Sequence, residues 1–135
     1  MTYAAFRSIG AYIPSKIMTN ADFEKIIDTS DEWITKRTGI KERRISEVDE
    51  ASSDLGSRAA EVAIQRAGIS KEEVDLVICA TVTPDYLCMP STACLIAAKV
   101  GLPPVMAFDV SAACTGFVYA VSIAKAFIES GMKKN

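Results

Sequence analysis

One cysteine stands where the sequence predicts that a strand turns into a helix. Cys114 lies in the stretch DVSAACTGF, among small residues that let the backbone turn sharply. The first N–H groups and the dipole of a helix favour a thiolate, and the same donors can hold a developing oxyanion. The pattern is that of a nucleophile elbow with sulfur in place of a hydroxyl. Cys114 is therefore a candidate nucleophile, and the alternative is a small buried cysteine that fills space.

Trp33 and Arg37 suggest a second kind of chemistry. The two residues are four apart and share one face of an expected helix. An adenine ring can stack on an indole, and phosphates can pair with a guanidinium. The pair is a candidate nucleotide site. The alternative is a partly buried tryptophan beside a solvated arginine.

The residue types argue against a metal site. The four cysteines show no C-x-x-C spacing, and the sequence contains no histidine. A bound metal is therefore not expected, and any step that needs imidazole cannot be completed by these residues alone. We expect Cys79 to be inert in a buried strand, and Cys88 and Cys94 to be packing residues.

Composition and charge narrow the class of protein. The 135 residues are 50% apolar and 24% charged, as in an ordinary folded domain. A net charge of −2 offers no electrostatic footprint for nucleic acid or an anionic membrane. Neither a signal peptide nor an apolar run of ~18 residues is evident. We expect a cytoplasmic protein with reduced thiols.

The first third of the sequence predicts one strand and two helices. Residues 3–13 favour a strand that Pro14 closes. A helical pattern begins at Asn20, and a second helix, opened by a capping box of Thr29 and Glu32, ends at Gly39. Residues 41–54 lack periodicity and indicate a solvated loop, which contains Lys41, Arg43 and Arg44.

The remaining residues alternate between strands and helices. Ser53 is expected to cap a helix that Gly68 ends, and Ser70 with Glu73 indicates a short helical turn. Strands are predicted at residues 74–80 and 105–110, with a helix between them that begins at Pro90 and Ser91 and ends at Gly101. This alternation indicates an α/β fold with a mainly parallel sheet.

The last helix bears on the architecture. Residues 117–128 leave almost no polar face, which is typical of a helix buried on all sides. One α/β layer covers only one side, so the pattern implies a second sheet that these residues do not contain. We therefore expect residues 1–135 to be a fragment of a larger fold that ends between two elements.

Four segments together resemble a known family. DTSDEWITKRTGIKERR, ATVTPD, MPSTAC and DVSAACTGF occur in the order seen in β-ketoacyl-acyl-carrier-protein synthase III, a thiolase-superfamily condensing enzyme. The resemblance implies the N-terminal half of a five-layer αβαβα arrangement with a mainly parallel mixed sheet. It implies the initiating condensation of type II fatty acid synthesis, in which acetyl-CoA and malonyl-acyl carrier protein give acetoacetyl-acyl carrier protein. No cofactor is implied, because acetyl-CoA is a substrate.

The resemblance also implies roles for particular residues. Cys114 matches the acylated nucleophile, whose histidine and asparagine partners lie in the C-terminal half. Thr29, Trp33 and Arg37 match residues that bind the CoA nucleotide. Met89 matches a residue that crosses a homodimer interface and limits the partner's acyl pocket. For Met89 the alternative is a core methionine.

Two other functions remain open. One is a synthase III relative that loads a different starter acyl-CoA. The other is a non-catalytic α/β binding or assembly module, in which Cys114 is only a packed residue. Substrate choice distinguishes the first from the acetyl-CoA enzyme, and selective alkylation of Cys114 would count against the second.

Overall fold

The computed structural model describes residues 2–135, which form two compact units. The N-terminal residues through Tyr12 and residues Ala51–Asn135 make the first unit, and Ile13–Glu50 make the second. Within residues 2–135, no helix combines the length and the apolar character needed to cross a membrane.

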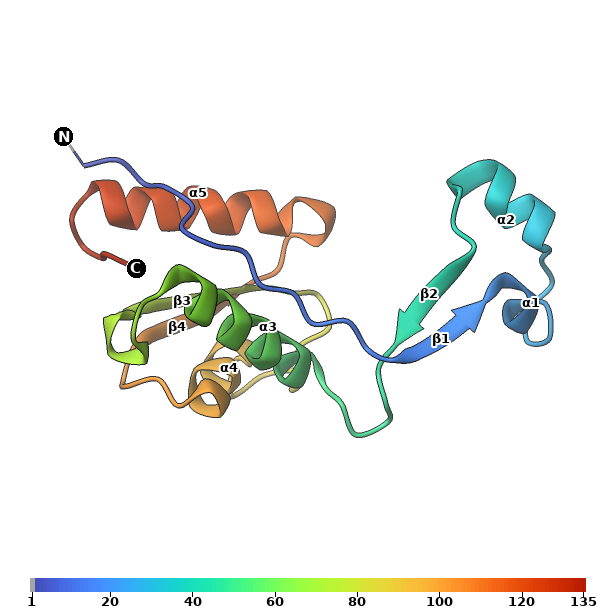
Figure 1. The fold of residues 1–135 in the computed structure, drawn as a ribbon, viewed down its shortest axis with the longest axis horizontal. Coiled ribbons are helices and arrows are strands. Elements are labelled where there is room, and N and C mark those ends of the chain that lie inside the picture. Colours follow the sequence, from blue (N-terminus) through green and yellow to red (C-terminus); the bar gives the residue numbers. More distant parts are fainter. Residues whose placement is uncertain (1) are drawn as a thin grey trace. The chain divides into compact units, whose positions relative to one another are not determined.

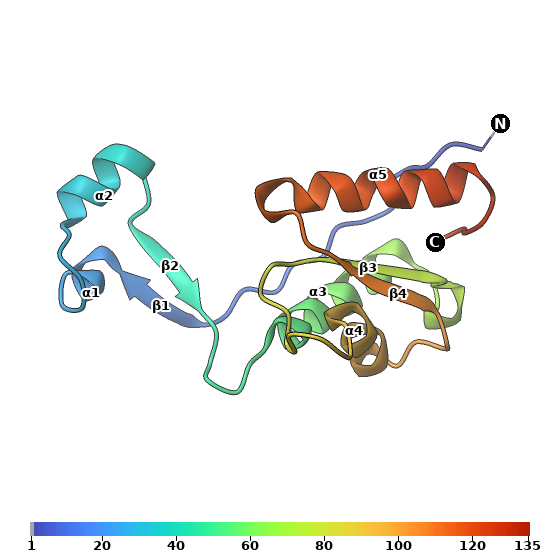
Figure 2. The ribbon, with the colours of Figure 1, turned by 180° about the vertical axis from the view of Figure 1, so that it is seen from behind.

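The first unit is built on a pair of parallel strands. Leu76 pairs with Met106 at one end and Ala80 with Val110 at the other. Figures 1 and 2 show two helices on one side of the strand pair and the last helix on the other. The prediction of an α/β fold with parallel strands is confirmed. The elements are α3 (Ser52–Ala67), β3 (Leu76–Ala80), α4 (Thr92–Val100), β4 (Met106–Val110) and α5 (Gly116–Glu129).

Local signals fix the ends of α3 and α4. The Ser91 hydroxyl accepts a hydrogen bond from the Cys94 amide at 3.2 Å, as expected for the first residue before α4. Gly68 and Gly101 follow α3 and α4 with φ of 66° and 75°, a left-handed conformation that favours glycine. The short turn predicted after Ser70 is a 3₁₀ helix, Lys71–Glu73.

The start of α3 differs from the expectation. The helix begins at Ser52, and the Asp54 carboxylate accepts from the Ala51 amide at 3.0 Å. Ser53 does not cap the helix; it is fully buried and donates instead to Asp85, with 2.5 Å between the oxygens. The prediction failed because a distant carboxylate competes for the Ser53 hydroxyl.

The predicted strand at residues 3–13 is wrong. The segment is extended but pairs with no strand among residues 2–135, and it lies along α3 and α5 (Figures 1 and 2). The Ser8 hydroxyl donates to the Ala63 carbonyl at 2.7 Å, and Arg66 donates to the Ile9 carbonyl at 2.8 Å. At Gly10 an added Cβ would lie 2.1 Å from the Ala59 carbonyl oxygen, so only glycine allows this close approach to α3.

The second unit is an antiparallel hairpin with two short helices. Lys16 pairs with Ile45 and Thr19 with Glu42. Part of the stretch predicted as a loop is therefore a strand, whose charged sequence gives no apolar alternation. The first helix ends at Phe23, earlier than predicted, and the second is capped by Ser30, not Thr29. The elements are β1 (Lys16–Thr19), α1 (Asn20–Phe23), α2 (Asp31–Thr38) and β2 (Glu42–Ile45).

The apolar core is small and lies on one helix. Among residues 2–135 the buried hydrophobic side chains are those of Ala93, Ile96, Ala97 and Val100, all on α4. Helix α5 exposes Phe117, Val118 and Tyr119, which agrees with the expectation that a sheet outside these residues covers its other side.

Candidate active site

Cys114 lies in a strained turn between β4 and α5. The chain leaves β4 at Val110 and passes through Ala113, whose φ of 44° is uncommon for a residue with a Cβ. A 3₁₀ turn, Ala113–Thr115, carries Cys114 to the start of α5. The Thr115 amide and hydroxyl both donate to the Ala112 carbonyl, at 3.1 and 2.8 Å. The structure therefore confirms the sharp strand-to-helix turn, and it exposes Cys114.

The C-terminal end of β3 contacts this turn. The Thr81 amide donates to the Val110 carbonyl at 3.2 Å, one residue beyond the paired strands. Gly116 is buried, and a Cβ there would lie 3.4 Å from the Ala80 Cβ. The first turn of α5 thus packs directly on the carboxyl ends of both strands, the usual place for a ligand site in parallel sheets.

Two carboxylates hold the loop that follows β3, residues 81–91. Asp109, on β4, accepts from the Thr92 and Ala93 amides at 2.8 Å each, so it caps α4 from the neighbouring strand. Asp85, within the loop, accepts from the Ser53 amide at 2.9 Å. Lys99 completes the link by donating to the Ser53 hydroxyl at 2.6 Å. The loop is therefore tied to the N-terminal ends of α3 and α4.

Cys114 lines an apolar cavity. The cavity has a volume of ≈ 800 Å³ and lies among α3, β3, α5 and the N-terminal segment. Most of its walls are aliphatic or small side chains, so it suits an acyl group better than a charged one. Lining residues include Cys79, Ala80, Ile96, Ala113, Cys114, Phe117 and Val121.

The other cysteines differ from Cys114 in their surroundings. Burial, and secondarily the charges of Asp109 and Asp85, raise the pKa of the Cys79 thiol to about 11. Cys79 is therefore protonated at neutral pH and a poor nucleophile, which agrees with the inert role expected for it. Cys88 and Cys94 are exposed, so the expectation that they are packing residues is wrong for residues 2–135.

Met89 is on the surface of this chain. Its side chain is 81% exposed, and a cis peptide bond joins it to Pro90. The alternative of a core methionine therefore does not hold within residues 2–135. Met89 lies in the loop 81–91, at the same end of the parallel strands as Cys114.

Trp33 and Arg37 are brought together on α2. The Arg37 guanidinium lies 4.4 Å from the centroid of the Trp33 ring, and the indole is 53% exposed. The pair thus presents a flat apolar surface beside a cation, as the spacing predicted. Thr29 is half-buried and precedes the Ser30 cap. These three residues belong to the second unit, and Cys114 belongs to the first.

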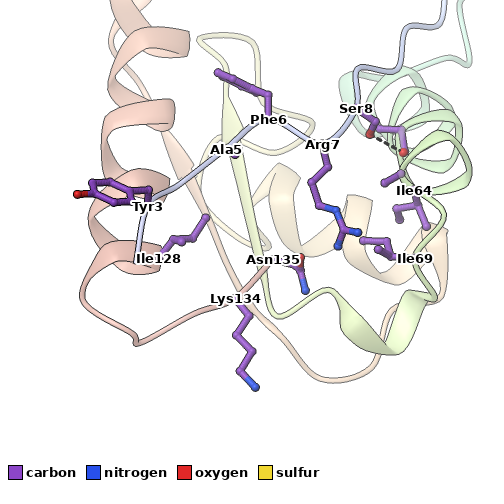
Figure 3. A pocket seen from close by; sticks show the side chains of 12 residues that line it. Tyr3, Ala5, Phe6, Arg7, Ser8, Ile64, Ile69, Ile128, Lys134 and Asn135 are labelled. Atoms are coloured by element: carbon purple, nitrogen blue, oxygen red, sulfur yellow. Dashed lines mark hydrogen bonds between the residues drawn. The ribbon is translucent and has the colours of Figure 1, made fainter. Parts of the chain in front are cut away.

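A second hollow in the first unit carries no chemistry of its own. It has a volume of ≈ 480 Å³ and lies between the N-terminal segment, α3 and the residues after α5. Figure 3 shows the Arg7 side chain extending into it, while Lys134 points away. Apolar side chains such as Phe6, Ile64 and Ile128 make up much of its wall.

In the part of the chain that the structure describes, no three His, Cys, Asp or Glu side chains are grouped so that they could hold a metal ion.

Known proteins match this chain over its whole length. The family described as 3-oxoacyl-[acyl-carrier-protein (ACP)] synthase III matches residues 108–135, which include Cys114. A curated relative from Aliarcobacter butzleri, named Beta-ketoacyl-[acyl-carrier-protein] synthase III, is 85% identical over 135 residues, or 100% of this chain. Over its whole length the chain is similar to proteins named β-ketoacyl-[acyl-carrier-protein] synthase III. It spans 40% of the length of that relative.

Solved synthase III structures share the fold. The enzyme from Aquifex aeolicus is 53% identical, with a TM-score of 0.87 over 92% of this chain and 40% of its own. The enzyme from Thermus thermophilus is 48% identical, with a TM-score of 0.89 over 97% of this chain and 40% of its own. The thiolase-like α/β fold expected from the resemblance is therefore confirmed for the N-terminal part of a synthase III.

Three residues of the site escaped the sequence analysis. Asp109 interrupts an apolar strand, which is a usable signal because unpaired carboxylates are rarely buried. Asp85 lies in an ordinary turn sequence and gave no such signal. The positive φ of Ala113 could not be foreseen, because glycine is the residue that usually marks such a position.

Proposed function

We propose that the complete protein catalyses the initiating condensation of type II fatty acid synthesis. It joins acetyl-CoA and malonyl-acyl carrier protein to give acetoacetyl-acyl carrier protein. The observation that carries the proposal is the placement of Cys114, which is exposed at a strained strand-to-helix turn and lines an apolar cavity. Similarity to the synthase III relatives supports the substrates.

The reaction has two covalent steps at Cys114. Its thiolate attacks the thioester carbonyl of acetyl-CoA, a new S–C bond forms, and the CoA thiolate leaves and takes up a proton. Malonyl-acyl carrier protein then loses CO₂, and the electron pair released on its α-carbon attacks the acyl-cysteine carbonyl. A C–C bond forms, and the Cys114 thiolate is restored. The second step needs groups that polarise the malonyl thioester, and the histidine among them comes from outside these residues, which contain none.

The second unit supplies the nucleotide site of the first substrate. The free face of the Trp33 indole accepts the adenine ring, and the Arg37 guanidinium pairs with a phosphate. Thr29 contacts the base. Because acyl carrier protein carries no adenine, these residues distinguish the first substrate from the second.

Met89 sets the length of the acyl group in a homodimer. Its side chain is exposed in one chain, which suits a residue that is covered by a second protomer. A large side chain at this position closes the acyl cavity of the partner. No metal or prosthetic group takes part in the proposed reaction.

Peptide mapping tests this function. The protein, extended to the length of its curated relatives, is incubated with isotope-labelled acetyl-CoA and digested. We expect label on the peptide that contains Cys114, and none after Cys114→Ser, because a hydroxyl without its own base is a weaker nucleophile. Cys88→Ser is the matched control, since Cys88 is also exposed. Label on another cysteine, or none on the unaltered protein, would contradict the proposal.

A further inference from the structure

The second unit is organised around one buried polar side chain. Of residues 13–50, all of which the structure describes, only Asn20 is buried, with 2% of its surface exposed. Helix α2 in the same unit buries none of its residues. The orientation of α2 therefore depends on polar contacts more than on an apolar core.

Asn20 contacts both ends of α2. Its amide nitrogen donates to the Asp31 carboxylate, in the first turn of α2, at 2.7 Å. The same nitrogen donates to the carbonyl of Ile40, just beyond the end of α2, at 2.8 Å. A longer contact of 3.4 Å reaches the Thr35 hydroxyl in the middle of the helix. One side-chain amide thus holds the start and the exit of α2.

Asn20 also ties α2 to the hairpin. Its side-chain oxygen accepts from Arg43 on β2 at 2.8 Å, and its backbone amide donates to the Lys41 carbonyl at 3.1 Å. The Arg43 guanidinium lies 4.4 Å from the centroid of the Phe23 ring on α1. All the polar groups of the Asn20 side chain are therefore engaged, and neither a carboxylate nor an aliphatic side chain can replace them.

We propose that Asn20 is a positioning residue for recognition of the CoA nucleotide. It touches no substrate itself. It fixes α2 so that the exposed Trp33 ring and the Arg37 guanidinium keep their common face toward the ligand. This inference rests on the proposed function of that pair, and it assigns the specificity of the first substrate to a residue outside the binding surface.

The test replaces the amide with an isosteric carboxylate. In Asn20→Asp an oxygen faces both the Asp31 carboxylate and the Ile40 carbonyl, so the contacts to α2 become repulsive. We expect the KM for acetyl-CoA to rise about 5- to 150-fold, the range that follows from leaving a buried polar group unpaired. The KM for malonyl-acyl carrier protein and kcat at saturating acetyl-CoA should stay unchanged. If Asn20 only supports the fold, Asn20→Asp should lower kcat and the melting temperature, and the two KM values should not differ in their response.

A second substitution should restore part of the loss. In the double variant Asn20→Asp with Asp31→Asn, the amide introduced at position 31 donates to the carboxylate introduced at position 20. The Ile40 carbonyl stays unpaired, so partial recovery of the acetyl-CoA KM is expected. The matched control is Glu32→Gln, an exposed carboxylate on the same helix, which should change neither KM. If Asn20→Asp does not fold, Asp31→Ala removes the same contact, and it too should raise the KM for acetyl-CoA.

Direct binding separates the two proposals. Calorimetry measures CoA binding to the complete unaltered protein and to the Asn20→Asp or Asp31→Ala variant. Absence of binding to the unaltered protein would overturn the proposed function of the Trp33 and Arg37 pair. Binding to the unaltered protein with the same Kd for the folded variant would overturn the positioning role alone.

Discussion

The Arg37 guanidinium stacks on the Trp33 ring, 4.4 Å from its centroid. One face of the indole is therefore occupied by a cation of the same helix, and the other face is available to a planar ligand. In the proposed complex, the adenine of CoA would stack on the other face of the indole, and the charge of Arg37 would lie close to the phosphates of CoA.

Removal of the indole should affect only the first substrate. Trp33→Ala removes the stacking surface, which costs about 1–3 kcal/mol for a nucleic acid base on an aromatic ring. We expect the acetyl-CoA KM to rise about 5- to 150-fold, the equivalent of that energy. Steady-state kinetics with each substrate varied in turn measures this. Equal changes in the two KM values would show that Trp33 supports the fold instead.

Cys79 should resist alkylation until the pH is high. Its pKa is raised to about 11, so about one thiol in a thousand is ionised at pH 8. Iodoacetamide should modify Cys79 slowly between pH 7 and 9, with a rate that rises steeply toward pH 11. Asp109→Asn removes one of the two charges that raise the pKa and should shift the profile to lower pH. Peptide-resolved mass spectrometry gives the rates, and a midpoint near 8.5 would contradict the assignment.

Met89 should control the length of the starter acyl group. In the proposed homodimer, Met89→Ala should enlarge the acyl cavity and extend activity to longer acyl-CoA substrates. Met89→Phe should restrict activity to the shortest. A series of acyl-CoA lengths assayed on the three proteins measures the effect. The same length profile in all three would mean that this exposed side chain has no part in the pocket.

Asp109 should stabilise the fold through α4. Asp109→Ala leaves the Thr92 and Ala93 amides without their carboxylate partner. We expect a loss of about 2 kcal/mol in the free energy of unfolding, as for the loss of a helix cap. Urea denaturation of the complete protein measures it, with Asp49→Ala, an exposed loop residue, as the control. Equal midpoints for the two variants would contradict the capping role.

Residues 1–135 alone should neither condense substrates nor remain monomeric. They contain no histidine, and each large apolar side chain left in water forfeits about 1.5–3 kcal/mol. The exposed Phe117, Val118 and Tyr119 of α5 favour association. Solution mass and a condensation assay of the isolated fragment check both expectations. A monodisperse monomer that condenses acetyl-CoA with malonyl-acyl carrier protein would refute them.

Strong local signals explain what the sequence could predict. Strand β3 is an apolar run between helices, and α4 is bounded by Ser91 and Gly101, so their bounds were close to those observed. The strand-to-helix turn at Cys114 is predictable because small residues surround the cysteine. In each case the information lies within about ten neighbouring residues.

Contacts between distant segments explain what was missed. Residues 3–13 have the composition of a strand, but a strand also needs a partner, and residues 2–135 offer none beside it. Strand β2 carries charged residues on both faces, Glu42 and Arg44 on one and Arg43 on the other, so its sequence shows no apolar alternation. The roles of Asn20 and Asp85 depend on partners 11 to 32 residues away, which no local pattern specifies.

The second unit is an insertion whose two ends are neighbours. Because Lys16 pairs with Ile45, the chain enters and leaves Ile13–Glu50 through adjacent strands. Such an arrangement lets a segment be lengthened, shortened or exchanged with little change to the host, as in natural domain insertions. The proposed CoA site lies in this unit and Cys114 lies in the other. Under the proposed function, exchange of the hairpin unit between synthases would change the donor specificity and leave the turn that holds Cys114 unaltered.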